Sequence, residues 1–338
     1  MIILQAVTDP DVVWLTPGKP DNISVGRRRI ADHLEERGFN ITVRGTSWRT
    51  VARSLRERNR YDVVIGTTRA GAISGVLLKL LGTPLIIDHI DPIRQFAENN
   101  PRWLAVIVRL LENVSFLAAD HVLYVYEEER PRVKRYASSY SETDLGVEFD
   151  RFADPNPEIV ESARNRLEAL DLAEQVVIYV GGLEPIYHIE ELLAAMEHLP
   201  DWSLIVAGTG SLQDTVSATA AQRSNVHYLG TVPHETVPGY LQAADVGVSL
   251  VDDPHTLKLL EYGAAGLPVV QAAGRAEARF GELVAYCEPE SASIASAISR
   301  AEDLDADELR AFASRFRWPE LTLDYAEAIR SGTQQTLE

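Results

Sequence analysis

Lys258 and Glu261 lie three positions apart in a segment with the apolar spacing of a helix. Side chains with this spacing project from the same face of a helix, so the amine and the carboxylate would lie together. The carboxylate could accept hydrogen bonds from both hydroxyls of a ribose, and N–H groups at the helix start could bind phosphates. The lysine could neutralise the charge of a departing nucleoside diphosphate. The alternative is an exposed ion pair that takes no part in chemistry.

Glycine turns end two apolar runs ahead of this helix. Gly181 and Gly182 end one run, and Gly208 and Gly210 end the next. A glycine turn lets the backbone approach a ligand closely, because no side chain stands in the way. Ligands bind at the carboxyl ends of parallel strands, so these turns are candidate binding elements.

Missing motifs exclude several other kinds of site. The chain has no G-x-G-x-x-G after its first apolar run and no P-loop, so a dehydrogenase or a P-loop enzyme is not expected. Its eight histidines and single cysteine, Cys287, show no zinc spacing, and the G-x-S-x-G motif of serine hydrolases is absent. We therefore expect no bound metal.

Short apolar runs alternate with stretches of helical period, which predicts βαβ units and mostly parallel sheets. In the first half, strands are expected at residues 2–7, 41–44, 63–65, 85–88 and 121–125. Helices are expected there at about 26–38, 47–59, 70–81 and 101–118. In the second half, strands are expected at 176–180, 203–207, 226–229, 246–249 and 269–271. Helices are expected there at about 187–198, 211–223, 234–243, 256–265 and 290–303.

These patterns give the fold class α/β, with two doubly wound lobes of Rossmann type. Asp, Asn and Pro residues break regular structure near residues 146–157, where the lobes join. We expect a first lobe at 1–150, a second lobe at 151–316, and a C-terminal helix and tail at 317–338 that could cross back to the first lobe.

Charge is distributed unevenly between the halves. The formal charge is −18, yet residues 1–150 carry 20 basic and 20 acidic groups, so the whole acidic excess lies in residues 151–338. Lysine is scarce, with four lysines against 28 arginines. An acidic, lysine-poor surface stays soluble in concentrated salt, which indicates a halophile's protein. The alternative is an ordinary acidic enzyme from a GC-rich genome.

The first half contains two basic clusters. One includes Arg53 and Arg56 within residues 49–60, and the other begins at Arg27, directly after Gly26. Such a surface could face anionic lipid headgroups or a phosphorylated acceptor, and its alternative is a solvated helix face. Nucleic acid is not an expected partner, because no recognition motif accompanies the charge and the chain is acidic.

Residues 103–117 carry apolar side chains around most of a helix. This pattern indicates a core helix or, with Trp103 at its start, a helix that docks on a bilayer surface. Glu112 and Asp120 are interpreted as solvated or helix-end charges. Because no signal peptide and no apolar run of spanning length is seen, we expect a cytoplasmic protein, with peripheral contact at the cytoplasmic face of the membrane as a further expectation.

The second half resembles the retaining, nucleotide-sugar-dependent glycosyltransferases of the GT-B fold, in particular glycosyltransferase family 4, also called group 1. The resemblance rests on the order and spacing of five segments, at residues 179–185, 205–210, 228–233, 240–247 and 254–270. The first half is similar more loosely, at 119–125 and 145–152. The resemblance implies two lobes that face each other across a cleft, a UDP- or GDP-hexose as donor substrate, and no cofactor.

The resemblance also implies roles for single residues. The family has two acidic residues eight positions apart, which match Asp253 near the transferred sugar and Glu261 at the ribose. His89 matches a histidine that contacts the donor sugar, although a structural role is the alternative. Asp91, like Asp88, could bind acceptor hydroxyls. The loop that contains Gly18 is similar to a family loop that reaches into the cleft, and a surface loop is the alternative.

Two positions depart from the family pattern. Gly182 stands where the family has an arginine and Tyr187 where it has a lysine, followed by His188 in place of a common glycine. The missing cations normally hold the diphosphate. Lys258, His188 and the N–H groups of Gly181 and Gly182 would have to replace them.

The sequence therefore predicts a retaining hexosyltransferase. The halophilic composition and the arginine-bearing first half suggest a lipid-linked saccharide of the dolichol-phosphate type as acceptor. This role resembles that of haloarchaeal hexosyltransferases in N-glycosylation of surface-layer proteins. Two alternatives stay open, namely a nucleotide-sugar 2-epimerase of the same fold and a catalytically degenerate protein that binds nucleotide sugar or a working transferase.

Overall fold

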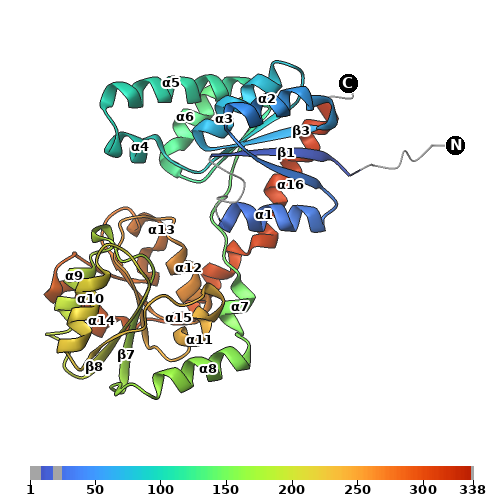
Figure 1. Cartoon of the computed structure of the whole chain (residues 1–338). Coiled ribbons are helices and arrows are strands. Elements are labelled where there is room, and N and C mark those ends of the chain that lie inside the picture. The colour runs from blue at the N-terminus through green and yellow to red at the C-terminus, as the bar shows by residue number, and fades with distance from the viewer. Residues whose placement is uncertain (1–8, 18–24, 336–338) are drawn as a thin grey trace. The chain divides into compact units, whose positions relative to one another are not determined.

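The computed structural model describes residues 9–17 and 25–335, which form two compact units (Figure 1). The first unit consists of residues 1–145 together with 318–338, and the second consists of residues 146–317. Each unit is built on one six-stranded sheet in which all paired strands are parallel. Among the described residues, no helix is long and apolar enough to cross a membrane.

The sheet of the first unit has the strand order β2-β1-β3-β4-β5-β6. In that order the strands are Asn40–Gly45, Asp11–Thr16, Val63–Thr67, Leu85–His89, His121–Tyr124 and Tyr140–Glu142. The helices are α1 (Val25–Glu36), α2 (Trp48–Arg56), α3 (Thr68–Lys79), α4 (Ile93–Asn99), α5 (Arg102–Ala118), α6 (Arg130–Tyr136) and α16 (Trp318–Gln335). Two short 3-10 helices are η2 (Arg58–Arg60) and η3 (Glu127–Glu129).

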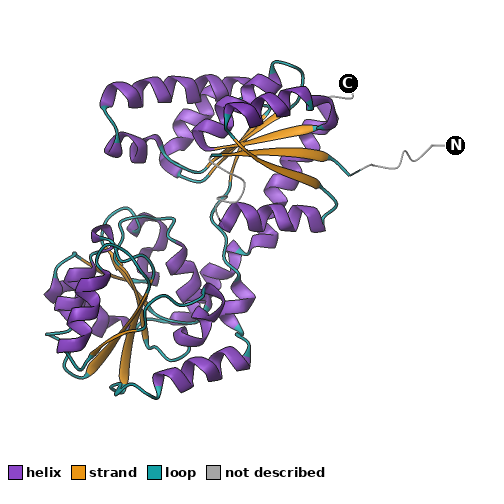
Figure 2. Ribbon diagram, viewed as in Figure 1, coloured by secondary structure: helices purple, strands orange, loops and turns teal. Residues whose placement is uncertain are grey.

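Alternate residues of β1 enter opposite layers of the core, because side chains alternate across a strand. Val12 and Trp14 pack in the layer that contains α1 and α16, whereas Val13 and Leu15 pack against α3 and α5. Helices thus cover both faces of this sheet (Figure 2). The C-terminal helix α16 belongs to this unit, where it packs beside α1.

The strand β1, Asp11–Thr16, was not predicted from the sequence. The predicted strand at 2–7 lies outside the described residues, and the strand that pairs with β2 and β3 is Asp11–Thr16. The short run Val-Val-Trp-Leu in that segment follows Asp9 and Pro10. Both flanking strands bury this run, and such tertiary pairing leaves little trace in the local sequence.

The sheet of the second unit has the strand order β12-β11-β10-β7-β8-β9. In that order the strands are Ala285–Cys287, Val269–Ala272, Val246–Ser249, Gln175–Val180, Trp202–Ala207 and Val226–Tyr228. The helices are α7 (Phe149–Ala153), α8 (Pro157–Leu167), α9 (Ile189–Ala195), α10 (Gln213–Gln222), α11 (Val237–Leu241), α12 (Leu257–Ala264), α13 (Glu277–Phe280), α14 (Ser291–Ala301) and α15 (Ala306–Ala313). Short 3-10 helices are η4 (Pro185–Tyr187), η5 (His234–Thr236), η6 (Gly281–Leu283) and η7 (Ser314–Phe316).

This sheet also separates two core layers. Val177 and Tyr179 of β7 face the layer with α9 and α14, whereas Val176 and Ile178 face the layer with α8, α12 and α15. Parallel strands buried on both faces require such continuous apolar runs. The arrangement brings the turns after β7 and β8 and the start of α12 to the same edge of the sheet, the edge of the carboxyl ends.

Candidate active site

Helix α12 carries Lys258 and Glu261 at the edge where the strands of the second unit end. Its buried face consists of Leu259, Leu260, Tyr262, Gly263 and Ala264, and this face fixes the rotation of the helix. The hydroxyl of Tyr262 accepts a hydrogen bond of 2.9 Å from the Val180 N–H, which ties α12 to the end of β7. Lys258 and Glu261 therefore stand on a rigid element beside the first glycine turn.

The amine of Lys258 lies between aromatic rings. Its Nζ is 4.3 Å from the ring centre of Tyr187 and 5.3 Å from that of Tyr179. Burial lowers the pKa of Lys258 to about 8, although the charge of Glu261 acts in the opposite direction. The side chain also lies against Gly181, where an added Cβ would stand 2.5 Å from Cε and 3.1 Å from Nζ. The turn after β7 thus carries one partly desolvated cation, supplied by α12.

The two departures from the family pattern fit together in space. The ring of Tyr187 covers Gly182, where an added Cβ would lie 3.1 Å from the ring atom Cε2. A longer side chain at position 182 would compete with this ring for space. Tyr187 in turn faces Lys258, so a small residue, an aromatic ring and a lysine occupy the region of the two absent cations.

Gly208 and Gly210 allow the two glycine turns to pack backbone against backbone. An added Cβ at Gly208 would lie 1.8 Å from the carbonyl oxygen of Gly181, and one at Gly210 would lie 2.4 Å from that of Leu183. The Gly181 N–H donates to the carbonyl of Ala207 at 2.9 Å. The expectation that this N–H group holds a diphosphate is therefore wrong, since the contact between turns already uses it.

Glu261 is held by a histidine that the sequence analysis did not select. His234 Nε2 lies 2.8 Å from Glu261 Oε1, and His234 Nδ1 lies 2.8 Å from Arg151 Nη2. A guanidinium can only donate, so Nδ1 accepts and Nε2–H donates to the carboxylate. His234 follows the turn at 228–233 that was used for the family resemblance, which is the signal that could have found it.

The ion pair proposed as the alternative for α12 is not formed. Among the ion pairs of the described residues, Glu261 pairs with His234 and not with Lys258. Glu261 keeps 17% of its side chain exposed, so a ligand hydroxyl can reach it. The two side chains on this face of α12 thus remain separately available, one as a hydrogen-bond acceptor and one as a cation.

Asp253 and His188 lie at the same edge in less regular backbone. Asp253 follows β10, and its Oδ1 accepts a hydrogen bond of 2.9 Å from the His255 N–H, which shapes the loop before α12. His188 has the left-handed backbone conformation, with φ 51° and ψ 42°. This conformation favours glycine, in agreement with the glycine that the family commonly has there. Its Nδ1 lies 3.7 Å from Glu191 Oε1.

In the first unit, His89 ends β4 and is buried. Its Nε2 lies 3.3 Å from Glu129 Oε2 and 3.2 Å from Arg132 Nη2. Burial raises the pKa of Glu129, but the hydrogen bond and charge of His89, with the charge of Arg132, outweigh it and bring the pKa to about 2. These contacts favour the structural interpretation of this histidine.

Asp88 and Arg27 are corrections to the sequence analysis. Asp88 is fully buried and forms a two-bond ion pair with Arg27, at 2.9 and 2.8 Å. Its carboxylate also accepts hydrogen bonds of 2.8 Å from Thr67 and Tyr325. The carboxylate therefore cannot bind an acceptor, and Arg27, only 2% exposed, cannot face a membrane. The pair instead joins α1 and α16 to the sheet.

Those of the remaining predicted residues that the structure describes form no hydrogen bond or ion pair with the buried Arg27–Asp88 pair or with Lys258 and Glu261. Arg53 and Arg56 are exposed on α2, and Arg53 Nε lies 3.1 Å from Glu57 Oε1. Asp91 is 41% exposed and lies 3.8 Å from Arg69. Gly18 lies outside the described residues.

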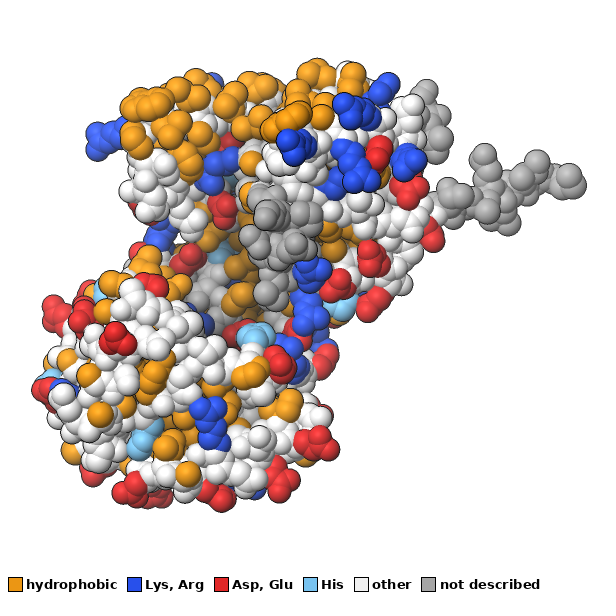
Figure 3. All heavy atoms as spheres, in the orientation of Figure 1, with side chains coloured by type: hydrophobic (Ala, Val, Ile, Leu, Met, Phe, Trp, Pro, Cys, Tyr) orange, Lys and Arg blue, Asp and Glu red, His pale blue; other side chains and the backbone are white. Residues whose placement is uncertain are grey.

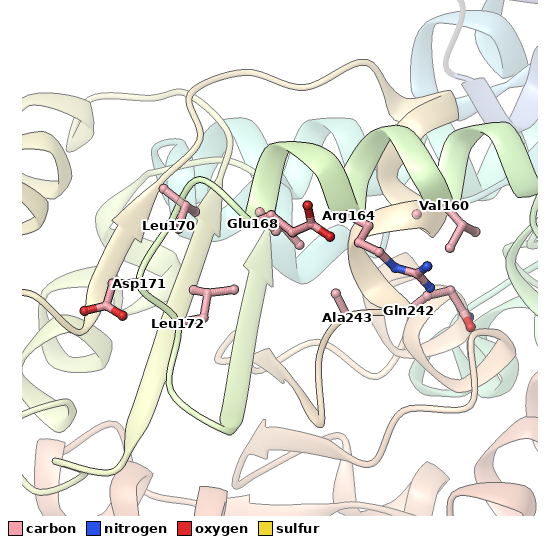
Figure 4. Close-up of a pocket in the computed structure, with 10 residues that line it drawn as sticks. Val160, Arg164, Glu168, Leu170, Asp171, Leu172, Gln242 and Ala243 are labelled. Carbon is pink, nitrogen blue, oxygen red and sulfur yellow. The ribbon is translucent and has the colours of Figure 1, made fainter.

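A separate surface hollow of about 350 Å³ lies in the second unit, between α8 and the segment after α11 (Figure 4). Val160 and Arg164 of α8 line one side, and Gln242 and Ala243 line another. None of the predicted site residues lines it. Within residues 9–17 and 25–335, no group of three or more His, Cys, Asp or Glu side chains could hold a metal ion.

Comparison with known proteins identifies the fold. Residues 174–303 match the family model described as glycosyl transferases group 1. The structure of HepE from Anabaena in complex with UDP and glucose matches 95% of this chain and 100% of its own, with a TM-score of 0.73 and 18% identity. Sucrose-phosphate synthase from Thermosynechococcus elongatus matches 95% of this chain and 98% of its own, with a TM-score of 0.74 and 16% identity. The chain has the GT-B fold.

In this GT-B chain, the region that matches the group 1 model contains Lys258, Glu261, Asp253, His188 and both glycine turns. The predicted fold class is confirmed. A curated relative, the D-inositol 3-phosphate glycosyltransferase of Segniliparus rotundus, is 32% identical over 227 residues, which are 58% of this chain and 49% of the relative. The chain thus spans about half the length of that relative.

Proposed function

We propose that this GT-B protein is a retaining glycosyltransferase that moves a hexose from UDP- or GDP-hexose to a lipid-linked saccharide. One observation carries the proposal: Lys258 and Glu261 stand on one face of α12, beside the glycine turn after β7 and within the group 1 region. A partly desolvated cation and a partly buried carboxylate at the carboxyl ends of parallel strands suit a nucleoside diphosphate and its ribose.

Each group has a distinct part in the proposed reaction. Glu261 accepts hydrogen bonds from the ribose hydroxyls, and its bond from His234 keeps the carboxylate turned to the edge of the sheet. Lys258 stabilises the negative charge that grows on the diphosphate as the bond to the sugar breaks, so no metal is needed in this proposal. Asp253 orients the transferred sugar, and His188 adds a donor to the phosphates.

The names of similar proteins support the nucleotide-sugar part. HepE was solved with UDP-glucose, and a trehalose-6-phosphate structure of E. coli was solved with UDP-2-fluoro glucose. WaaG is a glycosyltransferase involved in lipopolysaccharide biosynthesis, which supports an acceptor attached to a lipid. We extend this to a dolichol-phosphate type of acceptor in surface-layer N-glycosylation of a halophile, at the cytoplasmic face of the membrane, on the strength of the lysine-poor composition.

Radiolabel transfer tests the proposal. Labelled UDP- and GDP-hexoses are supplied one at a time to the purified protein with haloarchaeal lipid extract in molar potassium chloride. We expect label from one donor to enter the organic phase with wild type and with the control Glu235→Gln, an exposed glutamate near His234, but not with Glu261→Gln. Label that stays in an epimerised sugar, or donor that binds without turnover, would contradict the transferase.

A further inference from the structure

Helix α5 exposes a large apolar face. Seven large apolar side chains are 44% to 66% exposed, namely Trp103, Val106, Ile107, Leu110, Leu111, Val114 and Leu117. They recur at the spacing of one helix face. A surface helix normally turns such a face to the core.

The buried face of the same helix carries three polar side chains beside Ala105 and Phe116. Glu112 is 1% exposed, and Asn113 and Ser115 are also buried. Glu112 Oε2 lies 2.8 Å from Arg132 Nη1, and its Oε1 lies 3.2 Å from Arg69 Nε. The prediction that Glu112 is a solvated charge is therefore wrong.

These ion pairs fix the rotation of α5. Turning the apolar face inward would bring Glu112 out of its cluster and leave two arginines without this partner in a poorly solvated place, which is strongly unfavourable. The outward apolar face is thus maintained by the core beneath it. The sequence offered a core helix or a bilayer helix, and the structure packs one face and exposes the other.

Neighbouring helices extend the apolar surface. Helix α3 packs against α5 and exposes Leu77, and the turn directly after α3 exposes Leu80 and Leu81. Helix α2 packs against α3 and exposes 75% of Trp48. Figure 3 shows hydrophobic side chains gathered over these helices, with basic side chains beside them. We call the exposed side chains of these three helices, with Leu80 and Leu81, the α2–α3–α5 surface.

The charge on this surface has one sign. The three helices contain seven basic residues and one acidic residue, and that acidic residue is the buried Glu112. Arg49, Arg56, Arg102 and Arg109 are exposed and form no ion pair within the described residues. This is an exception in a chain with a formal charge of −18. An apolar centre with exposed arginines matches a bilayer that has acyl chains below and anionic headgroups above.

We propose that the α2–α3–α5 surface docks this protein on an anionic lipid bilayer. A second copy of the chain fits less well, because a two-fold contact through this patch would bring arginines against arginines. This proposal rests on the proposed function only for the reason why the protein would bind a membrane, since a lipid-linked acceptor lies at the membrane surface. Binding to vesicles needs neither donor nor acceptor, so failure of either proposal leaves the other measurable.

Tryptophan fluorescence and pelleting with vesicles test this proposal. Trp48 and Trp103 are 75% and 66% exposed, whereas Trp14, Trp202 and Trp318 are at most 5% exposed. Vesicles of phosphatidylcholine with phosphatidylglycerol should therefore shift the emission of wild type to the blue and pellet the protein. Vesicles of phosphatidylcholine alone should bind more weakly, and molar salt should remove this difference by screening.

Matched variants make the result specific. The double variant Leu110→Glu and Val114→Glu should weaken vesicle binding by about tenfold or more, because two charges enter the acyl region. The control Leu323→Glu changes a residue of α16 that is 51% exposed in the other layer of the same unit, and it should bind like wild type. Replacing Arg102 by Gln should weaken binding to anionic vesicles by about fivefold.

Three results would overturn the proposal. Wild type could fail to pellet with either vesicle, or the double variant could pellet like wild type. The third is self-association of wild type through this face, abolished by the double variant and accompanied by no vesicle binding. All substituted side chains are exposed, and circular dichroism verifies that each variant is folded.

Discussion

Replacing Lys258 by Met should lower donor turnover and raise stability at the same time. The amine is partly desolvated between Tyr179 and Tyr187, and its pKa is lowered to about 8 from an ordinary value of 10.5. The lowered pKa means that the charged amine is less stable in the folded state than in the unfolded chain. Keeping Lys258 protonated at pH 7 therefore lowers the free energy of unfolding. A shift of this size corresponds to at most about 3 kcal/mol.

The sign of the pH dependence follows from the direction of the shift. Below pH 8 the lysine is charged in both states, so the full penalty is present, and it shrinks as the pH rises from 8 toward 10.5. We therefore expect Lys258→Met to raise the free energy of unfolding by about 1–3 kcal/mol at pH 7, and by less at pH 9. Urea denaturation followed by circular dichroism measures this difference.

Turnover should change in the opposite direction. A hydrogen bond to a charged group contributes about 1.5–3 kcal/mol, so losing the bond to the diphosphate should lower kcat/KM by about 10- to 100-fold. In wild type, kcat/KM should fall as the pH rises through about 8, since it reports the free enzyme. Lys258→Arg should keep its activity to higher pH.

Lys134→Met is the matched control, because Lys134 is exposed and lies in the first unit. It should leave turnover and stability within experimental error of wild type. If Lys258→Met also leaves both unchanged, or if it lowers both, the assignment of a desolvated, functional cation is refuted.

Three further substitutions, one of them with a matched control, test the supporting structure. Gly208→Ala should destabilise the protein by more than about 3 kcal/mol, because the new Cβ would stand 1.8 Å from a carbonyl oxygen. The control Gly230→Ala has nothing within 4 Å of its new Cβ and should destabilise the protein by only about 1 kcal/mol through backbone strain. Thermal denaturation compares the two variants. Asp88→Ala should lower the free energy of unfolding by about 3–5 kcal/mol in urea titrations, because it removes the carboxylate that balances the charge of the buried Arg27 guanidinium. His234→Ala should raise the KM for the donor several-fold by freeing the Glu261 carboxylate, and steady-state kinetics would count against this role if KM stays the same.

The fold was largely predictable because apolar periodicity is a local signal. The expected helix at 256–265 is observed as Leu257–Ala264, and the one at 101–118 as Arg102–Ala118. Short strands were missed, including Tyr140–Glu142 and Ala285–Cys287, because three residues carry too little pattern. The strand Asp11–Thr16 was missed for a different reason, since its burial depends on two partner strands.

Buried polar residues were the main failure at the level of single side chains. Arg27, Asp88 and Glu112 look like surface charges in the sequence, yet each lies in an ion pair below the surface. Their partners are at least 20 residues away in the chain, so no local spacing reveals them. His234 was missed for the same reason, since its contact with Glu261 spans 27 positions.

The central claim is that Lys258 and Glu261 hold a nucleoside diphosphate at the edge of the second sheet. Calorimetric titration of UDP and GDP into wild type, Lys258→Met, Glu261→Gln and Lys134→Met tests it most directly. The account predicts that wild type and Lys134→Met bind one nucleotide equally well, and that the other two variants bind it at least about tenfold more weakly. Equal binding by all four proteins, or no binding of either nucleotide by wild type, would contradict the account.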